Sequence, residues 1–477
     1  MHLCSANTSP SPAPGLSRPT PPVPGNLIVT AIDDEDNSKA NGVDVNIAGP
    51  QSATAPTAGA GEAPFNGIAT GDYTITHSSV CYTSATAKAT VQPAQTARAE
   101  LHIKHIHAAI TVKQLTFSGH TVVEQDTTGD FAKPEWLDGR ADHSPVSYAR
   151  NVKVAFEAKF KVATAPCRPE KVDIKGSATF GSASLEWTAT VTVSPGDTEA
   201  TATLSSNNAL PNAVGIFEST DIVWQMNPGA IGWTAAGTTR NVVYVTLGPP
   251  SGTPNYWTLL DLSCRAAAGE TTEAGVITKA YTPLRTRAIP RKRDAVSLTY
   301  WKPQVTCKAT VTKELLAATD GAGQCGSWAE FLVDMYRVHG ITSGQKILVV
   351  RTMADWTGST TTFMVKNWVF DHPPASAKSA FTHIVPTECR PGVNHPGQNN
   401  TAPPPAFYNH FIVRAQGVFW DPSYGTGSYA DQAAWEADGI DGLMRNVEPR
   451  AGFDKSLNPT TKLLEFYVIS GSSFTKI

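Results

Sequence analysis

The sequence has little charge and no long apolar run. Only 17% of its 477 residues are Asp, Glu, Lys or Arg, and the formal net charge is -3. This balance provides no global field that would attract nucleic acid or an anionic membrane. No window approaches the ~18 consecutive apolar residues of a membrane-spanning helix. The sequence therefore predicts neither a nucleic-acid partner nor a membrane span.

A signal peptide and a clear disulfide pattern are also missing. The N-terminus, MHLCSANTSPSPAPG, has no apolar stretch of the kind that a secretory leader needs. The seven cysteines are Cys4, Cys81, Cys167, Cys264, Cys307, Cys325 and Cys389. Their number and spread fix no pairing, but they are compatible with an oxidising compartment. We expect an extracytoplasmic or secreted protein, with a cytoplasmic location as the alternative.

What the chain has in abundance is Thr, Ser, Ala, Gly and Pro, a composition typical of short strands joined by turns. At the usual ~150 residues per domain, its length predicts about three domains. Residues 1–25 are rich in proline and predict a disordered, polyproline-prone tail. We expect a multidomain, mostly β protein with few helices.

Residues 26–107 predict an antiparallel β-sandwich. Short runs such as NLIVTAID and GDYTITHS alternate apolar and polar residues and are bounded by turn residues. The stretch APFNGIATGDYTIT resembles the recurrent turn of bacterial prealbumin-like sandwiches, namely the carboxypeptidase-regulatory-like and Cna-B-like modules. The resemblance places Phe65, Ile68, Tyr73 and Ile75 in the core and a turn at Gly71. Such modules act as spacers or binding units.

Residues 108–255 predict a second, Ig-like sandwich, because strand-like runs follow one another without helices. Just before it, LHIKHIH places His105 and His107 on one face of a strand, with His102 nearby. No third ligand shares that face, so we interpret the trio as polar residues between domains and not as a metal site.

Residues 256–477 predict an α+β domain. Its first half carries helix-compatible stretches, at 261–284 and 311–340, and antiparallel strand patterns follow. Between the helices lies RTRAIPRKR, which we interpret as a solvated basic loop, since no aromatic residues interleave with its charges for base stacking.

The segment GQCGSWAEF at 323–331 places Cys325 in the first turn of a helix. Trp328, Phe331, Leu332, Met335 and His339 share one helical face, and Gly340 is suited to end the helix. A thiol at a helix start meets unpaired backbone N–H groups and the positive end of the helix dipole, which favour a thiolate and can stabilise an oxyanion. The alternative is that Cys325 is a buried, inert thiol.

The segment NHFIVRAQGVFWDPSYG can supply a base and its orienting acceptor. If Gln416 and Gly417 form a two-residue hairpin turn, Ala415 pairs with Val418 and Ile412 lies opposite Asp421. Asp421 then becomes a diagonal neighbour of His410, within reach of its side chain. A three-residue turn would move Asp421 to the other face and end this assignment.

Together, GQCGSWA and NHFIVRAQGVFWDPSYG resemble the transglutaminase-like superfamily, in which a Cys at a helix start, a His and an Asp form a papain-like triad. Residues that match tissue-type transglutaminases are Gly323, Gln324, Cys325 and Ala329, and those similar to peptide N-glycanases are Gly326 and Trp328. The resemblance covers roughly 256–477 and implies Cys325 as nucleophile, His410 as base and Asp421 as its orienting acceptor, with no cofactor.

The resemblance also implies residues around the cleft. The upstream aromatic residue that often assists the oxyanion would be Tyr300 or Trp301, beside Gln324 and Gly326. A hydrophobic rim would use Trp328, Trp368 and Trp420, which can equally be core residues. A Pro-rich insertion at 371–408 would border the cleft; its His372, His383, Cys389 and His395 match no compact metal motif.

These observations predict a cysteine-dependent enzyme that acts on a protein or peptide amide through an acyl-thioester. If water resolves the thioester, the enzyme is a protease, amidase or deamidase; if an amine resolves it, the enzyme is a transglutaminase. The sequence leaves this choice open. One form of this hypothesis is a bacterial effector exported without a cleaved signal. The alternative is a catalytically inactive surface or secreted protein that binds partners through its β-sandwiches.

Overall fold

The computed structural model describes residues 22–229, 231–302, 309–350, 361–365, 369–370, 382–383, 389–390, 396–401, 403, 406–407, 409–445, 452–454 and 464–477. The chain is mostly β, with several sandwich sheets and few helices in these residues, as its composition predicts. Its contacts divide it into two compact units. Unit 1 comprises Met1–Ala109, Thr164–Glu170 and Val193–Asp197; unit 2 comprises Ile110–Ala163, Lys171–Thr192 and Thr198–Ile477.

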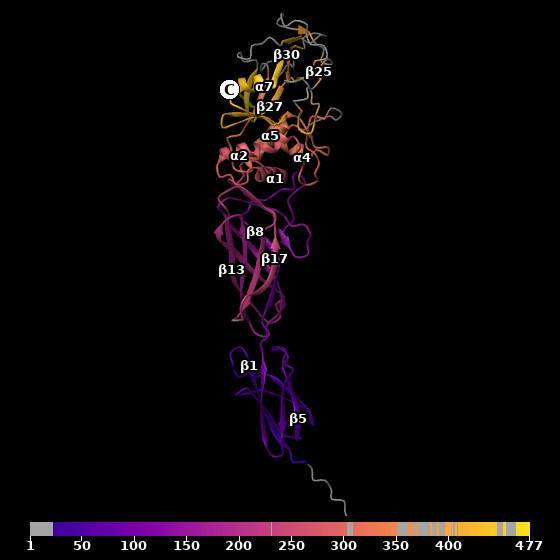
Figure 1. The fold of residues 1–477 in the computed structure, drawn as a ribbon, viewed down its shortest axis with the longest axis vertical. Helices are drawn as coiled ribbons and strands as arrows, with labels where there is room; N and C mark the ends of the chain where they lie inside the picture. Colours follow the sequence, from indigo (N-terminus) through magenta and orange to yellow (C-terminus); the bar gives the residue numbers. More distant parts are fainter. Residues whose placement is uncertain are drawn as a thin grey trace, which may run out of the picture. The chain divides into compact units, whose positions relative to one another are not determined.

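Unit 1 is a two-sheet β-sandwich, drawn in indigo and violet in Figure 1. One sheet has the order β4-β1-β7 and the other β3-β2-β5-β6. The strands are β1 (Gly25–Asp33), β2 (Asp44–Ala48), β3 (Ala53–Pro56), β4 (Glu62–Ile68), β5 (Gly71–His77), β6 (Ala87–Val91) and β7 (Thr96–Ile103).

The alternating runs bury one face of each strand in unit 1. Phe65, Ile68, Tyr73 and Ile75 all lie in its core, as predicted. Gly71 has a φ of +140°, and a Cβ there would lie 2.6 Å from the Pro50 ring, so only glycine fits this turn. The expectation of a wholly antiparallel sandwich was wrong, because β1 and β7 pair in parallel. Such a pair needs a long crossover, which the five intervening strands provide.

His105 and His107 do not lie on a strand as predicted. β7 ends at Ile103, so His105 and His107 follow the strand and do not share one of its faces. His105 Nε2 lies 3.0 Å from Asp33 Oδ2, and His107 is paired with both Glu35 and Glu170. No group of three or more described His, Cys, Asp or Glu side chains could hold a metal ion. The carboxylates contact these histidines directly.

The His107 pairs predict a pH-dependent contribution to the stability of unit 1. Burial opposes the charged form, but the hydrogen bonds to Glu170 and Glu35 outweigh it and raise the pKa of His107 above 6.5. The stabilisation is therefore complete below pH 6.5 and is lost as pH rises through the raised pKa. We expect Glu35→Gln to lower the melting temperature at pH 6 and to have a smaller effect at about pH 9. Calorimetry on both proteins at the two pH values checks this; an equal loss at both would refute it.

A disulfide joins Cys81 to Cys167 within unit 1. The sequence could not select this pair, because 86 residues separate the two cysteines and many pairings were open. Cys264 and Cys325, both buried, are the free thiols among the described residues.

The first part of unit 2 is another β-sandwich, built from four-stranded sheets of order β14-β11-β8-β9 and β13-β12-β16-β17, with a smaller sheet β10-β18-β15. Phe156, Trp187 and Trp224 pack together in its core. The strands are β8 (Ala109–Ser118), β9 (Trp136–Leu137), β10 (Val146–Ala149), β11 (Lys153–Thr164), β12 (Glu170–Phe180), β13 (Ala183–Val193), β14 (Glu199–Ala209), β15 (Gly215–Phe217), β16 (Asp221–Pro228), β17 (Thr234–Arg240) and β18 (Val243–Thr246).

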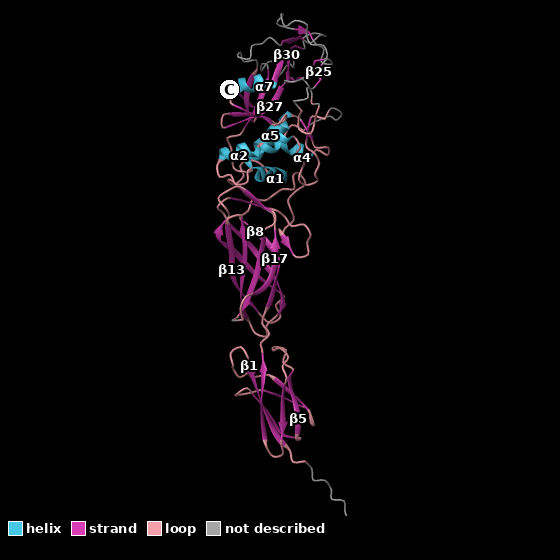
Figure 2. Cartoon of the chain, viewed as in Figure 1, coloured by secondary structure: helices cyan, strands magenta, loops and turns pink. Residues whose placement is uncertain are grey.

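The helices of unit 2 follow this sandwich. They are α1 (Trp257–Ala266), α2 (Glu273–Ala280), α3 (Thr282–Thr286), α4 (Thr312–Ala317), α5 (Cys325–Arg337) and the later α7 (Gln432–Gly439). Of these, α1, α2, α4 and α5 gather in one cluster, and α7 lies apart from them among the later strands (Figure 2). The stretch at 261–284 is interrupted between α1 and α2, where Gly269 has a φ of +88°. Thr272 then begins α2 by accepting a hydrogen bond from the Gly275 N–H at 3.2 Å.

Antiparallel strands after α5 form a six-stranded sheet of order β29-β28-β27-β21-β32-β33, and α5 packs on β27 and β21. A second sheet has the order β24-β31-β30-β22-β26; β19 pairs with β20, and β23 with β25. The strands are β19 (Thr299–Tyr300), β20 (Ala322–Gly323), β21 (Gln345–Val350), β22 (Thr361–Val365), β23 (Val369–Phe370), β24 (Thr382–His383), β25 (Cys389–Arg390), β26 (Ala406–Phe407), β27 (Asn409–Ala415), β28 (Val418–Asp421), β29 (Thr426–Tyr429), β30 (Ile440–Arg445), β31 (Gly452–Asp454), β32 (Glu465–Ser470) and β33 (Ser473–Lys476).

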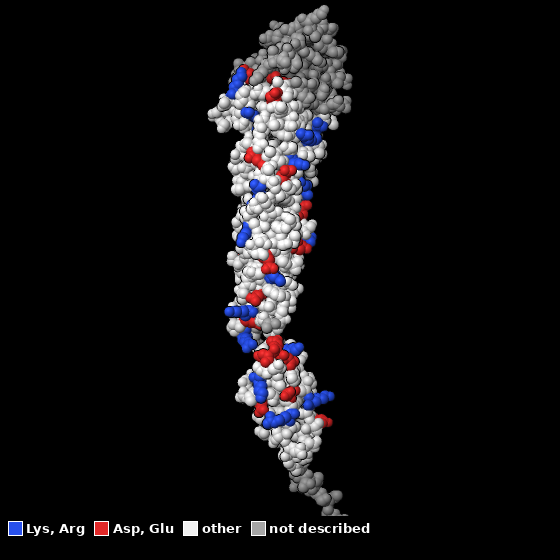
Figure 3. Space-filling model, turned by 60° about the vertical axis from the view of Figure 1, so that its left-hand side comes forward, with Lys and Arg blue, Asp and Glu red and all other residues white. Residues whose placement is uncertain are grey.

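The surface carries charges of both signs. On the face shown in Figure 3, acidic and basic side chains are interspersed along the described part of the chain. Among the described helices, none combines the length and the apolar character required to cross a bilayer.

Candidate active site

Cys325 is the first residue of α5 and is 6% exposed. Trp328, Phe331, Leu332 and Met335 form the buried face that the spacing predicts, and Gly340, at a φ of +77°, follows the helix end. The N–H groups of Cys325 and Gly326 belong to the first helical turn, so they have no acceptor within the helix. The helix start therefore presents backbone donors and a positive dipole end beside the thiol.

The two glycines beside Cys325 allow close packing around the helix start. A Cβ on Gly323 would lie 2.3 Å from Ser327 Oγ. A Cβ on Gly326 would lie 3.0 Å from the Thr310 carbonyl oxygen. Neither glycine has a positive φ, so the reason for glycine here is space and not backbone conformation.

The predicted two-residue hairpin is present. Ala415 pairs with Val418 and Val413 pairs with Trp420, which places Ile412 opposite Asp421. Gln416 and Gly417 have φ values of 50° and 83°, and positive φ at both positions is typical of a type I′ turn. With this register, His410 Nε2 and Asp421 Oδ2 lie 2.9 Å apart, and both residues are buried.

The surroundings of His410 favour its charged form. Burial lowers its pKa, but the Asp421 carboxylate and then the Cys325 thiol outweigh burial and raise the pKa well above 6.5. Since Nε2 is paired with Asp421, Nδ1 is the ring nitrogen that remains for the thiol. The structure therefore brings together Cys325, His410 and Asp421 in the order thiol, imidazole, carboxylate.

Two aromatic residues hold the imidazole, and the sequence did not indicate either. The Trp435 ring, from α7, stacks on His410 at 6.1 Å and 14°, and its Nε1 donates to Asp421 Oδ2 at 3.4 Å. The Tyr424 ring lies 5.7 Å from the His410 ring. Tyr424 stands in the quoted DPSYG motif and could have been considered; Trp435 could not, because no local pattern links α7 to β27.

Gln324, Tyr300 and Trp301, which were predicted to assist the oxyanion or to line the cleft, lie in surroundings that differ from one another. Gln324 is the N-cap of α5; its backbone N–H donates to Ala309 O and its carbonyl accepts from Ser327. Tyr300 is fully buried, and its ring lies 5.3 Å from that of Tyr424. Trp301 has a φ of 52°, and its N–H donates to the Gly323 carbonyl at 3.1 Å.

Trp328 and Trp420 are core residues and form no exposed rim. Trp328 is 0% exposed and packs on Phe331, while Trp420 is 3% exposed and packs on Tyr281. Trp328 is buried because it lies on the apolar face of α5, and Trp420 is buried because it lies on the inward face of β28. Trp368 and the side chains of His372, His383, Cys389 and His395 lie outside the described part of the chain.

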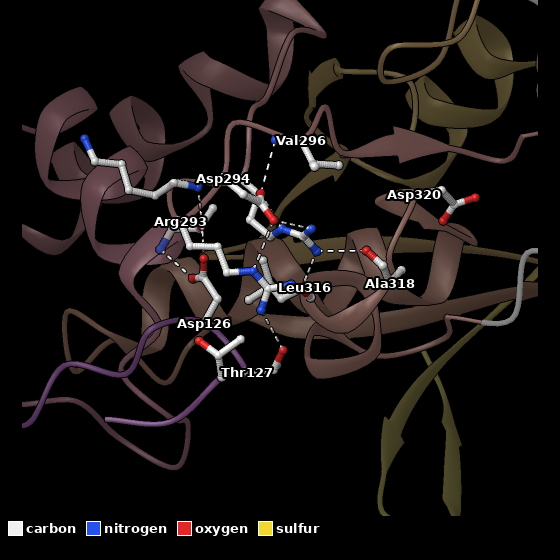
Figure 4. Close-up of polar contacts among 12 residues, drawn as sticks. Asp126, Thr127, Arg293, Asp294, Val296, Leu316, Ala318 and Asp320 are labelled. Atoms are coloured by element: carbon white, nitrogen blue, oxygen red, sulfur yellow. Dashed lines mark hydrogen bonds and ion pairs between the residues drawn. The ribbon is translucent and has the colours of Figure 1, made fainter. Parts of the chain in front are cut away.

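The interpretation of RTRAIPRKR as a solvated loop was wrong for Arg291, which is 2% exposed. Its Nη1 donates to the carbonyls of Leu316 and Ala318 at 2.6 and 2.8 Å, at the end of α4. It also makes two hydrogen bonds to Asp294, which Figure 4 labels together with Leu316 and Ala318. These bonds lower the pKa of the Asp294 carboxyl to about 2. A charge count cannot reveal that one cation of a basic run is needed to satisfy the end of a helix.

No protein-family model matches the chain, and no curated protein matches it either. Solved structures with some likeness include BcpA, the major pilin subunit of Bacillus cereus, with 11% identity over 46% of this chain and 69% of that chain, at a TM-score of 0.19. The full-length major pilin SpaD from Corynebacterium diphtheriae has 8% identity over 46% of this chain and 65% of that chain, at a TM-score of 0.18.

GBS52, a minor pilin of Streptococcus agalactiae, has 16% identity over 18% of this chain, at a TM-score of 0.16. The chain spans 46% of the length of that pilin. Each of these likenesses covers less than half of the present chain, and nothing about its function follows from them.

Proposed function

We propose that the chain is a transglutaminase-like cysteine enzyme that transfers the acyl group of a protein or peptide amide through a thioester on Cys325. The observation that carries this proposal is the His410–Asp421 hydrogen bond of 2.9 Å, next to a thiol at a helix start. A base that is hydrogen-bonded to an orienting acid and lies beside a nucleophile is the arrangement that nucleophilic acyl transfer requires.

In the first half-reaction, Cys325 Sγ attacks the amide carbonyl carbon and forms a C–S bond. His410 donates its proton to the departing nitrogen as the C–N bond breaks. In the second half-reaction, water or an amine attacks the thioester, His410 accepts its proton, and the C–S bond breaks. Asp421 remains a carboxylate throughout and stabilises the imidazolium.

The helix start can stabilise the negative oxygen of each tetrahedral intermediate. The N–H groups of Cys325 and Gly326 lie in the first turn of α5, where helix geometry provides them with no internal acceptor. An oxygen bound there would also meet the positive end of the helix dipole. Hydrolysis and amine transfer use this same machinery, so both remain within the proposal.

The Cys81–Cys167 disulfide supports an extracytoplasmic location for this activity, because such bonds persist in oxidising compartments. The β-sandwiches would then connect the enzyme to its site of action. A second candidate function, partner binding by the sandwiches with an inactive C-terminal domain, is favoured by the large share of the chain that they form.

The test is selective alkylation of the folded protein. With limiting iodoacetamide between about pH 5 and 8, we expect Cys325 to be labelled fast even at acidic pH, because a Cys-His ion pair provides thiolate there. His410→Ala should remove this acid-side labelling, and Cys325→Ala should remove the label and all turnover while the fold remains. Cys264, fully buried, serves as an unreactive internal reference. Slow labelling of Cys325, like that of an ordinary thiol, would favour the binding function instead.

A further inference from the structure

Residues 421–424, which we call the Asp421 turn, accept a hydrogen bond at each of their backbone carbonyls. Every donor is a residue outside the turn. The Asp421 carbonyl accepts from Tyr281 OH at 2.9 Å, and the Tyr424 carbonyl accepts from Arg287 Nε at 2.7 Å. Between them, the Pro422 and Ser423 carbonyls accept from the side chain and the backbone N–H of one residue, Gln398, at 2.8 and 3.0 Å.

Gln398 connects the Asp421 turn to two other parts of the site. Its Nε2 also donates to the Leu284 carbonyl in α3 at 2.7 Å, and its own carbonyl accepts the Tyr300 N–H at 2.8 Å. Gln398 is 0% exposed. A buried amide is costly unless its donors are used, and both N–H bonds of this amide have acceptors.

The neighbours of Gln398 make contacts of the same kind. Asn399 Nδ2 donates to the Leu298 carbonyl at 2.6 Å. Asn400 Nδ2 donates to the carbonyls of Tyr300 and Trp301 at 2.9 and 2.6 Å. A Cβ on Gly397 would lie 2.6 Å from the Tyr300 ring, so this segment approaches β19 closely.

These contacts link the carboxylate to the nucleophile. β19, which the 397–400 segment holds, pairs through Tyr300 with Gly323 of β20. Gly323 stands two residues before Cys325, at the entry to α5. The segment therefore fixes the Asp421 turn relative to the strands that lead to the thiol.

We propose that Gln398 is a positioning residue that holds the Asp421 turn, and through it the Asp421 carboxylate, in place beside His410. The proposal rests on the proposed function of Cys325, His410 and Asp421. Gln398 does not touch reacting atoms. Its effect arises because a catalytic group displaced by about 1 Å can lose on the order of a hundredfold in rate.

The experiment uses Gln398→Met, which keeps the length of the side chain and removes both amide donors. Its matched control is Asn241→Leu in the β-sandwich, because Asn241 is a buried amide that donates to two carbonyls, those of Glu135 and Ser144. Each variant is made in the full chain, its melting temperature is measured, and iodoacetamide labelling of Cys325 is followed between about pH 5 and 8, well below the melting temperature.

We expect both variants to melt earlier and only Gln398→Met to lose acid-side labelling, by at least about tenfold at pH 5, the equivalent of a shift of one pH unit. A Gln398→Met protein that is folded and has the wild-type pH profile would overturn the positioning role, even though the wild-type protein and His410→Ala behave as the proposed function requires. Slow acid-side labelling in the wild-type protein would overturn the proposed function and this inference together.

If Gln398→Met does not fold, Tyr281→Phe provides the same test. This change removes the hydroxyl that donates to the Asp421 carbonyl and leaves the ring in place on Trp420. We expect a loss of acid-side labelling in the same direction and of smaller size. An unchanged profile in a folded Tyr281→Phe protein would overturn the positioning of Asp421 through its turn.

Discussion

Asp421→Asn is expected to lower the rate of Cys325-dependent acyl transfer by about 10³- to 10⁴-fold while the hairpin remains folded. The amide is isosteric with the carboxylate but has no charge to stabilise the His410 imidazolium, and its NH₂ group can impose the wrong imidazole tautomer. The measurement is ammonia release, and incorporation of a labelled primary amine, with a glutamine-rich protein as substrate. A variant as fast as the wild-type protein would assign the third role to another residue.

The same variant has a readout that needs no substrate. In the wild-type protein, Asp421 and Cys325 raise the pKa of His410 against the effect of burial. A raised pKa means that the stabilisation of the charged imidazole is complete below pH 6.5 and is lost as pH rises through the higher value. Asp421→Asn should therefore destabilise the protein most at acidic pH and less at alkaline pH. Melting temperatures of the wild-type protein and the variant, measured at acidic and at alkaline pH, check this.

The control for both measurements is Asp173→Asn in the β-sandwich. Asp173 accepts a hydrogen bond from Thr190 at the surface, so this change removes a carboxylate of the same type far along the sequence from the site. We expect it to leave acyl transfer and acid-side labelling unchanged. A similar loss in both variants would attribute the effect of Asp421→Asn to charge in general and not to its contact with His410.

Local sequence rules were sufficient for the parts of the site that depend on short-range geometry. The spacing of apolar residues predicted that Cys325 would lie in the first turn of a helix, and a two-residue turn predicted that Asp421 would reach His410. Both inferences use periodicity and register, which span fewer than ~15 residues. The positive φ values at Gln416 and Gly417 show how the backbone achieves this turn.

Periodicity and register could not predict the long-range contacts. Trp435 meets His410 although 25 residues (435 minus 410) separate them, and Gln398 reaches Leu284 across 114 residues. Nothing in the composition of a Pro-rich segment indicates that its PGQNN stretch, at 396–400, would supply amide donors to buried carbonyls. The parallel pairing of β1 with β7 and the Cys81–Cys167 pair were missed for the same reason, because sequence patterns do not rank distant partners.

The largest expected effect on stability is that of Arg291→Met. Methionine fills much of the same space but leaves the Leu316 and Ala318 carbonyls at the end of α4 without their donor. Each buried polar group left unsatisfied costs about 1–3 kcal/mol, so we expect the free energy of unfolding of unit 2 to fall by roughly 3 kcal/mol. For a unit as large as unit 2 that corresponds to a melting temperature lower by on the order of 4 °C.

Arg240→Met is the matched control. Arg240 also makes two hydrogen bonds to one carboxylate, that of Asp221, but its side chain is 55% exposed, so water replaces the lost contacts. Calorimetry on the wild-type protein and both variants should show an early transition in unit 2 for Arg291→Met alone. Because α4 lies directly before β20 and Cys325, the same variant should also slow acid-side labelling. Equal melting temperatures for the two variants would mean that the basic run is solvated after all, and that the end of α4 is satisfied without Arg291.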